Sequence, residues 1–159
     1  MNRVGLTEGV HPVGPDDGQK LVEVWEAAVR ATHHFLSEPD IQFFKPFVLN
    51  ELLGLPHLLC MRDPAGDVIG FVGVADGKME ALFVHPSRHR EGIGRRLAAH
   101  AIEKLGVLTV DVNEQNSEAV SFYKHIGFEV YQRSELDNLG KPFPLLHMRL
   151  HQRASDFVT

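Results

Sequence analysis

The chain has 159 residues, enough for one domain with a substantial hydrophobic core. A hydrophobic fraction of 43% and a charged fraction of 23% are typical of a globular protein. The net charge of −5 argues against a general nucleic-acid binder and against a protein held to anionic membranes by its charge.

The cysteine content and the hydropathy indicate a cytoplasmic protein with no membrane partner. The single cysteine, Cys60, allows no internal disulfide, and its apolar neighbours predict a buried structural thiol rather than a nucleophile. No apolar run approaches the ~18 residues that span a bilayer, and the N-terminal residues lack a signal-peptide pattern.

The N-terminal third is predicted to be helical after a short first strand within residues 7–13. Asp16 or Asp17 can cap a first helix, in which apolar residues recur at helical spacing. A second helix is expected over 39–53, because a proline at its start suits the first turn. Pro46 interrupts this second helix, so we expect a kink or two short pieces.

The middle of the chain is rich in β-forming residues. Strands are expected over 58–62, 68–75 and 79–84. Asp76-Gly77 is a strong two-residue hairpin signal between the second and the third of them. These three runs therefore predict an antiparallel meander.

The remaining elements complete a mixed pattern of helices and strands. A helix is expected over 93–105, and Asn116 can cap another that ends near Gly127. Further strands are expected over 107–112, 128–134 and 145–150. The pattern indicates one α+β domain over residues 1–159, with a mixed, mostly antiparallel sheet of about six or seven strands flanked by helices.

Two glycines, Gly92 and Gly94, stand where a predicted strand gives way to a predicted helix. Without a Cβ they let consecutive amides face one concavity, and the helix N-terminus adds a partial positive charge. Four arginines crowd the same nine residues of an acidic protein: Arg88, Arg90, Arg95 and Arg96. The loop is therefore predicted to bind an anion such as a pyrophosphate. A glycine-containing turn with a solvated basic face is the alternative interpretation.

Two other phosphate-binding patterns do not fit this loop. The Walker pattern requires Lys-Ser or Lys-Thr after its second glycine, where this chain has Arg95-Arg96. The dinucleotide fingerprint requires a third glycine at the position of Leu97.

The loop 89–94, His-Arg-Glu-Gly-Ile-Gly, resembles motif A of the GCN5-related N-acetyltransferases, with His89 in place of the usual Gln or Arg. A second stretch, 113–119, followed by Phe-Tyr at 122–123 and Gly-Phe at 127–128, resembles motif B of the same family. The segments 31–37 and 139–146 look like those of the YjaB-type bacterial branch of this family.

The resemblance implies an acetyl-CoA-dependent N-acetyltransferase that acts on a primary amine by direct attack in a ternary complex. It implies a GNAT-type, α/β/α-like domain with a splayed gap between the strands over 79–84 and 107–112, which would admit the cofactor. The acceptor would be a small-molecule or peptide amine, and a homodimer is left open. No metal is implied.

The family's cofactor-binding and catalytic roles carry over onto matching positions. The pyrophosphate would lie against a run of amides and side chains: His89, Arg90, Glu91, Gly92, Ile93, Gly94 and Arg95. Main-chain groups of Phe83 and Val84 would pair with the pantetheine arm, and a bulge near Phe83 would supply an oxyanion donor. Asn116 would bind the cofactor, and Tyr123 would bind it and protonate the departing thiolate. From helical spacing alone, Tyr123 is a core residue.

The catalytic base is the most open assignment. Glu80, on the strand beside the cofactor, is the first candidate and would act through water; an ordinary exposed strand carboxylate is the alternative interpretation. His33 and His34 are the second candidate and a potential acceptor site, with capping or packing as the alternative. Lys141 lies in a loop over 137–144 that either closes over the acceptor or forms a plain surface turn. No cluster has metal-ligand spacing.

Two other functions are compatible with these motifs. One is a coenzyme A-binding sensor or interaction module without turnover, and the other is an unrelated nucleotide- or phosphate-binding protein. The sequence leaves open the amine acceptor, the length of the acyl donor and the oligomeric state.

Overall fold

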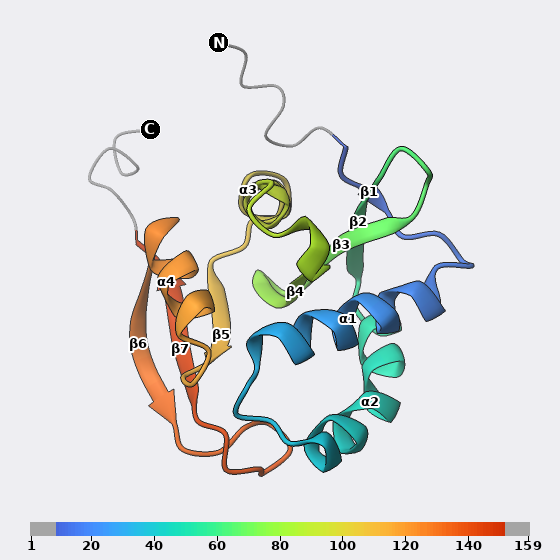
Figure 1. The fold of residues 1–159 in the computed structure, drawn as a ribbon. Helices are drawn as coiled ribbons and strands as arrows, with labels where there is room; N and C mark the ends of the chain where they lie inside the picture. The colour runs from blue at the N-terminus through green and yellow to red at the C-terminus, as the bar shows by residue number, and fades with distance from the viewer. Residues whose placement is uncertain (1–8, 152–159) are drawn as a thin grey trace, which may run out of the picture. The chain divides into compact units, whose positions relative to one another are not determined.

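The computed structural model describes residues 9–151 (Figure 1). This part of the chain contains seven β-strands and four α-helices, so the predicted α+β class is confirmed. It falls into two compact units, with the boundary between Val107 and Leu108. None of the helices within 9–151 is long and apolar enough to cross a membrane.

The first unit contains the N-terminal helices and the meander. Its elements are β1 (His11–Pro12), α1 (Gly18–Thr32), α2 (Glu38–Leu53), β2 (His57–Arg62), β3 (Val68–Ala75), β4 (Lys78–Val84), the 3-10 turn η2 (Pro86–Arg88) and α3 (Ile93–Leu105). β1 to β4 pair in chain order, and each pair is antiparallel. The predicted meander is therefore confirmed. Of the first strand predicted over 7–13, only residues 9–13 fall within the described part of the chain. The strand observed there is β1, His11–Pro12.

The β3–β4 hairpin turns at Asp76 and Gly77, whose φ angles are 50° and 75°. Two consecutive positive φ angles are the geometry of a type I′ turn, which matches the twist of paired strands. The hairpin signal in the sequence is thus confirmed at its predicted position.

Helices cover both faces of the strands in the first unit: α1 and α2 lie on one face and α3 on the other (Figure 1). Phe71 of β3 is fully buried in the core cluster with residues of α1 and α2. Its neighbour Gly70 points to the opposite face, because side chains alternate along a strand. A Cβ on Gly70 would lie 3.1 Å from Ile93 and 3.2 Å from Leu97, so α3 packs closely there.

The start of α1 differs in one respect from its prediction. Asp17 is at the N-cap position, but its side chain makes no capping hydrogen bond. Its carboxylate instead accepts a bond of 2.7 Å from the amide of Gly14 and pairs with Arg62 of β2. The predicted side-chain cap is therefore wrong, because a guanidinium and a nearer amide take up the carboxylate.

The second helix begins with a reciprocal cap that the sequence analysis did not identify. The hydroxyl of Ser37 accepts from the amide of Asp40, and the carboxylate of Asp40 accepts from the amide of Ser37. Pro39 lies in the first turn, as predicted. The helix then continues through Pro46 as a single element, so it is not divided into two pieces, and the alternative of a kink stays a prediction.

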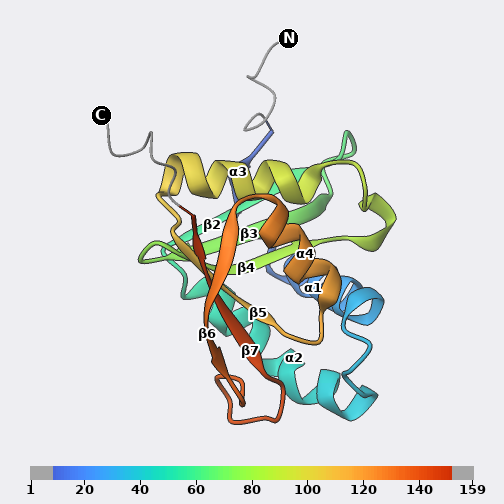
Figure 2. The ribbon, with the colours of Figure 1, turned by 90° about the vertical axis from the view of Figure 1, so that its left-hand side faces the viewer.

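The second unit contains β5 (Thr109–Asn113), α4 (Ser117–His125), β6 (Phe128–Ser134) and β7 (Leu145–Leu150). β7 lies between β5 and β6 and is antiparallel to both (Figure 1), and Figure 2 shows the same strands from the side of β6. The side-chain oxygen of Asn116 accepts from the amide of Ala119, so the predicted cap of α4 is confirmed. The gap expected between 79–84 and 107–112 falls at the boundary of the two units and stays a prediction.

Candidate functional site

The segment between β4 and α3 is folded into a defined loop. The amide of His85 donates to the carbonyl of Ile69 at 2.8 Å, and the turn η2 follows. Arg90 and Gly92 both have left-handed backbones, with φ angles of 70° and 80°. These two positive φ angles redirect the chain into α3, whose first residue is Ile93.

Gly92 leaves the N-terminus of α3 open to a ligand. No side chain caps this helix, and the amides of its first turn have no acceptor within the helix. A Cβ added to Gly92 would meet no atom within 4 Å, so the space around this residue is open. A phosphate group suits this arrangement, because the helix N-terminus carries a partial positive charge. The residues present therefore fit the diphosphate of coenzyme A.

Three of the four arginines predicted for this segment fall into two kinds. Arg88 lies 3.1 Å from a carboxylate oxygen of Glu91 and 3.8 Å from one of Asp63, so neighbouring acids balance its charge. Arg90, in the loop, and Arg95, in the first turn of α3, are exposed. The positive charge that faces a ligand is therefore smaller than the count of four arginines suggests.

His89, the departure from motif A, ties the loop to the end of β4. Its Nε2 lies 3.1 Å from the carbonyl oxygen of Val84. A carbonyl can only accept, so the ring donates from Nε2. His89 thus contacts a main-chain group that the resemblance assigned to the pantetheine arm.

Glu80 occupies an irregular position in β4. The register places Gly73 opposite Ala81 and Val74 opposite Met79, so Glu80 has no opposite partner on β3. Such an extra residue is a β-bulge and re-aims its side chain. The carboxylate is exposed and lies 3.5 Å from the ammonium of Lys78.

The bulge was expected near Phe83, and this expectation is wrong for the β3–β4 ladder. Phe83 lies directly opposite Phe71, and the pairing is regular from Ala81 to Val84. The ring centroids of Phe83 and Phe71 are 5.7 Å apart, so packing against the core fixes this end of β4. In the ladder, the irregularity lies at Glu80 instead.

His33 and His34 follow the last residue of α1 but differ in their surroundings. Burial lowers the pKa of His33 to about 4, and the neighbouring His34 adds to the shift. The Nδ1 of His33 lies 2.8 Å from the hydroxyl of Thr32, while His34 is exposed. A neutral His33 with so low a pKa is a weak base at neutral pH.

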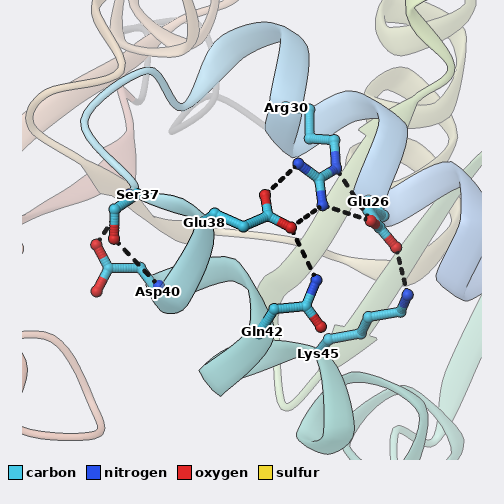
Figure 3. A network of polar contacts seen from close by, with 7 residues as sticks. All are labelled: Glu26, Arg30, Ser37, Glu38, Asp40, Gln42 and Lys45. Atoms are coloured by element: carbon cyan, nitrogen blue, oxygen red, sulfur yellow. Dashed lines mark hydrogen bonds and ion pairs between the residues drawn. The ribbon is translucent and has the colours of Figure 1, made fainter.

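A polar network that the sequence analysis did not identify joins α1 to α2 (Figure 3). Arg30 donates to Glu26 and, through two nitrogens, to both carboxylate oxygens of Glu38. Lys45 lies 2.6 Å from the second oxygen of Glu26. The hydrogen bond from Arg30 lowers the pKa of Glu38 to about 2. No local pattern indicated this network, because Arg30 and Glu38 are on different helices.

Tyr123 belongs to α4 in the second unit, and Asn116 is the N-cap residue of the same helix. Tyr123 is 7% exposed, and its ring makes edge contacts with Phe122 and Phe128 at 5.3 and 5.8 Å. Burial raises the pKa of the Tyr123 hydroxyl well above its usual value, so the phenol is protonated at neutral pH. The carbonyl oxygen of Asn116 caps the helix, which leaves its amide NH₂ group as the part suited to bind a ligand.

Lys141 lies in the β6–β7 loop, which is organised by Asp137. The carboxylate of Asp137 accepts from the amides of Leu139 and Lys141 at 2.9 and 2.8 Å. Its own amide donates to the carbonyl of Lys141. These bonds define the loop backbone, and the role of the Lys141 side chain toward an acceptor stays a prediction.

The predicted residues fall into two sets. β4 and the following loop bring together Glu80, Phe83, Val84 and 89–95, and His33 and His34 belong to the same unit. Asn116, Tyr123 and Lys141 belong to the second unit. Within residues 9–151, no group of three or more His, Cys, Asp or Glu side chains could hold a metal ion.

Cys60 is the buried thiol that the sequence predicts. Its exposed fraction is 0%, and it belongs to the core cluster of the first unit. Burial raises the pKa of the Cys60 thiol. Because the thiolate is the reactive form, the prediction that Cys60 is structural is confirmed.

Comparison with known proteins identifies relatives over most of the chain. The profile of the family described as "Acetyltransferase (GNAT) domain" matches residues 56–130. The peptidyl-lysine N-acetyltransferase YjaB of Salmonella typhimurium strain LT2 is 41% identical over 133 residues, which cover 84% of this chain and 91% of that protein.

Solved structures show the same fold. The solution structure of apo-form YjaB from Escherichia coli has a TM-score of 0.81 at 36% identity, covering 91% of this chain and 97% of that one. The PaiA N-acetyltransferase of Thermoplasma acidophilum in complex with coenzyme A has a TM-score of 0.68, with coverage of 89% and 98%. The latter is 23% identical, so it supports the fold alone.

Proposed function

This chain belongs to the GCN5-related N-acetyltransferase (GNAT) superfamily, in the YjaB branch, and we propose that its acceptor is the ε-amine of lysine in a protein or peptide. It is an N-acetyltransferase that uses acetyl-CoA as its cosubstrate. The lysine acceptor is supported by the name of the relative at 41% identity, a peptidyl-lysine N-acetyltransferase. The observation that carries the donor site is the open, uncapped helix start at Gly92.

We propose that the whole chain acts as one acyltransferase domain over residues 1–159. The family match at 56–130 crosses the boundary between Val107 and Leu108. The relative from Salmonella is likewise aligned over 84% of the chain. Matches that span both units support the proposal of one domain.

The donor site is proposed to lie along β4 and the start of α3. The amides over 90–95 would hold the diphosphate, and the main chain at Phe83 and Val84 would align the pantetheine arm. The amide of Asn116 would donate to the same ligand. When bound, acetyl-CoA supplies an acetyl thioester, a reactive acyl group with a thiolate leaving group.

Tyr123 is proposed as the general acid. Its hydroxyl is protonated at neutral pH, and that proton can be given to the leaving sulfur. A thiol of pKa near ~8.5 is a fair leaving group, so Tyr123 accelerates the step without being indispensable to it. Edge contacts with two phenylalanine rings hold the phenol in place.

The acceptor requires a base. A lysine amine of pKa ~10.4 is neutral in only about one molecule in 2,500 at pH 7. Deprotonating it at this pH therefore costs a free energy of roughly 4.6 kcal/mol. Glu80 is the proposed base, acting through water, because the bulge turns it out of the β3–β4 ladder. His33 is the weaker candidate, since its pKa of about 4 makes it a poor proton acceptor.

Thiol release from acetyl-CoA tests this proposal on a panel of amines. A peptide with one internal lysine and a blocked N-terminus should be acetylated faster than the same peptide with a free N-terminus and no lysine. Faster reaction of the lysine-free peptide, or of free polyamines, would contradict the lysine acceptor. Coenzyme A binding without thiol release from any amine would favour a sensor.

We also propose a cytoplasmic location and a function independent of nucleic acid. The reduced, buried Cys60 suits a reducing compartment. The net charge of −5 disfavours nucleic acid. Fractionation and filter binding test these two points, and light scattering tests for the homodimer that the family resemblance leaves open.

A further inference from the structure

Three side chains of the second unit form a continuous hydrogen-bonded series that the acetyltransferase function does not use. The hydroxyl oxygen of Ser134 lies 2.6 Å from Nε2 of His147. Nδ1 of the same ring lies 2.6 Å from a carboxylate oxygen of Asp111. A serine, a histidine and an aspartate are therefore connected in the order of a serine-nucleophile triad.

The sheet register brings these side chains together. Asp111 of β5 lies directly opposite His147 of β7, and Ser134 of β6 lies opposite Leu145, the residue two before His147. Side chains two apart share a face of a strand, so all three side chains project from one face. The three residues belong to three adjacent strands, which fixes their spacing.

This face is distinct from the face that carries Tyr123. Met148 follows His147 in β7 and therefore points to the opposite face, as does Val130, which is paired with it. Phe128 lies on that opposite face too, and its ring contacts Tyr123 of α4. Among the described residues of the second unit, α4 is the one helix, and it packs on the face away from Ser134.

The contacts define what each group does. A carboxylate accepts, so Asp111 holds the proton of His147 on Nδ1 and leaves Nε2 as the acceptor. Nε2 then accepts from the hydroxyl of Ser134. The side chains of His147 and Asp111 are 17% and 15% exposed, which limits competition from water while leaving the site reachable.

We propose that Ser134 is an acyl-accepting nucleophile for activated esters and thioesters, with His147 as its base and Asp111 as the residue that orients the ring. The Ser134 oxygen forms a bond to the acyl carbon, and its proton passes to Nε2 of His147. The carbon–oxygen or carbon–sulfur bond of the substrate breaks, and the leaving group takes that proton. Water then releases the acid by the same steps in reverse.

The direct test is labelling of the wild-type protein with diisopropyl fluorophosphate in the absence of acetyl-CoA. Attack by the Ser134 oxygen displaces fluoride, and peptide mass spectrometry locates the adduct. We expect modification at Ser134, with hydrolysis of p-nitrophenyl acetate abolished by the same reagent. Modification of another residue alone, or no modification, would overturn the proposal.

Substitutions separate a triad from a simple serine–histidine contact. Asp111→Asn and His147→Gln should each slow labelling of Ser134 at least tenfold while the circular dichroism spectrum is retained. Ser87 is the internal control: its hydroxyl lies 2.8 Å from Nδ1 of His85, but the described residues place no carboxylate on that ring. Equal labelling of Ser87 and Ser134 would contradict a role for Asp111.

The labelling outcome is independent of the lysine acetyltransferase proposal. The reagent needs neither acetyl-CoA nor an amine, so failure of amine acetylation would leave the Ser134 result unchanged. Conversely, an unreactive Ser134 would leave the acetyl transfer assigned to Tyr123 intact.

Discussion

The guanidinium of Arg30 donates two parallel hydrogen bonds, of 2.6 and 2.9 Å, to the carboxylate of Glu38. Arg30 is in the last turn of α1 and Glu38 in the first turn of α2, so the pair closes the connection between the two helices (Figure 3). The connection contains His33 and His34. The ion pair therefore spans a segment that the family resemblance places at the acceptor side.

Glu38→Gln should loosen this connection without unfolding the protein. The amide loses the charge that Arg30 binds, so we expect faster hydrogen exchange over 33–37 and a changed KM for the acceptor at nearly constant kcat. Hydrogen-exchange mass spectrometry and steady-state kinetics measure both effects. Glu51→Gln, an exposed carboxylate of the same helix, is the control and should change neither.

Gly92→Ala should weaken coenzyme A binding at least tenfold. A left-handed backbone costs an L-residue roughly 1–2 kcal/mol, so alanine would disfavour the conformation of Gly92 that leads into the uncapped start of α3. Calorimetric titration with coenzyme A measures the loss. Gly66→Ala is the matched control, because Gly66 has a φ of +92° and open surroundings in the β2–β3 turn. Similar losses of affinity in both variants would argue against a diphosphate site at the start of α3.

Tyr123→Phe should lower kcat about 100-fold while coenzyme A affinity changes less than tenfold, because the hydroxyl acts mainly as a proton donor. The ring contacts with Phe122 and Phe128 are retained by phenylalanine. Thiol release and calorimetry separate the two effects. Tyr131→Phe, which alters the other tyrosine of the chain, should leave kcat unchanged. An unchanged kcat in Tyr123→Phe would support the sensor interpretation.

His33 should make the protein less stable as the pH falls. Its pKa is about 4 in the folded protein and about 6.5 in the unfolded chain, so between these values only the unfolded state gains the proton. Stability due to this group is therefore present above pH 6.5 and is lost on acidification toward pH 4. The slope is at most about 1.4 kcal/mol per pH unit.

Urea unfolding of the wild type and of His33→Gln at pH 7, 6 and 5 measures this contribution. The variant should show a shallower decline in the free energy of unfolding over that range. His34→Gln, at the exposed neighbouring position, should keep the steep decline of the wild type. Parallel declines for His33→Gln and the wild type would contradict burial of a neutral imidazole.

The sequence predicted those structural features that neighbouring residues determine. The hairpin at Asp76 and Gly77 and the cap at Asn116 depend on residues within one turn of chain, and both were found where expected. The cap by Asp17 failed because its carboxylate binds Arg62, 45 positions further along the chain. Such a competitor becomes visible only once β2 is placed beside α1.

In the functional residues, too, features set by one short segment could be predicted, and features set by distant strands could not. The glycines of the loop and the motif around Tyr123 could be read from spacing, because each lies on one short segment. The contact between His147 and Asp111 spans 36 positions and depends on the β5–β7 register. The bulge at Glu80 likewise requires knowledge of which residues of β3 and β4 are opposite. Neither was accessible without the strand pairing.

The burial of Cys60 makes the native enzyme compatible with its own assay. Thiol reagents that detect free coenzyme A react with thiolates, and the one cysteine of the chain is fully covered and held in its protonated form. The folded protein should therefore give no background signal when such a reagent is used to measure coenzyme A release. In the absence of substrate, the rate at which a thiol reagent modifies Cys60 would instead measure how often the core opens. The single cysteine would thus report on unfolding.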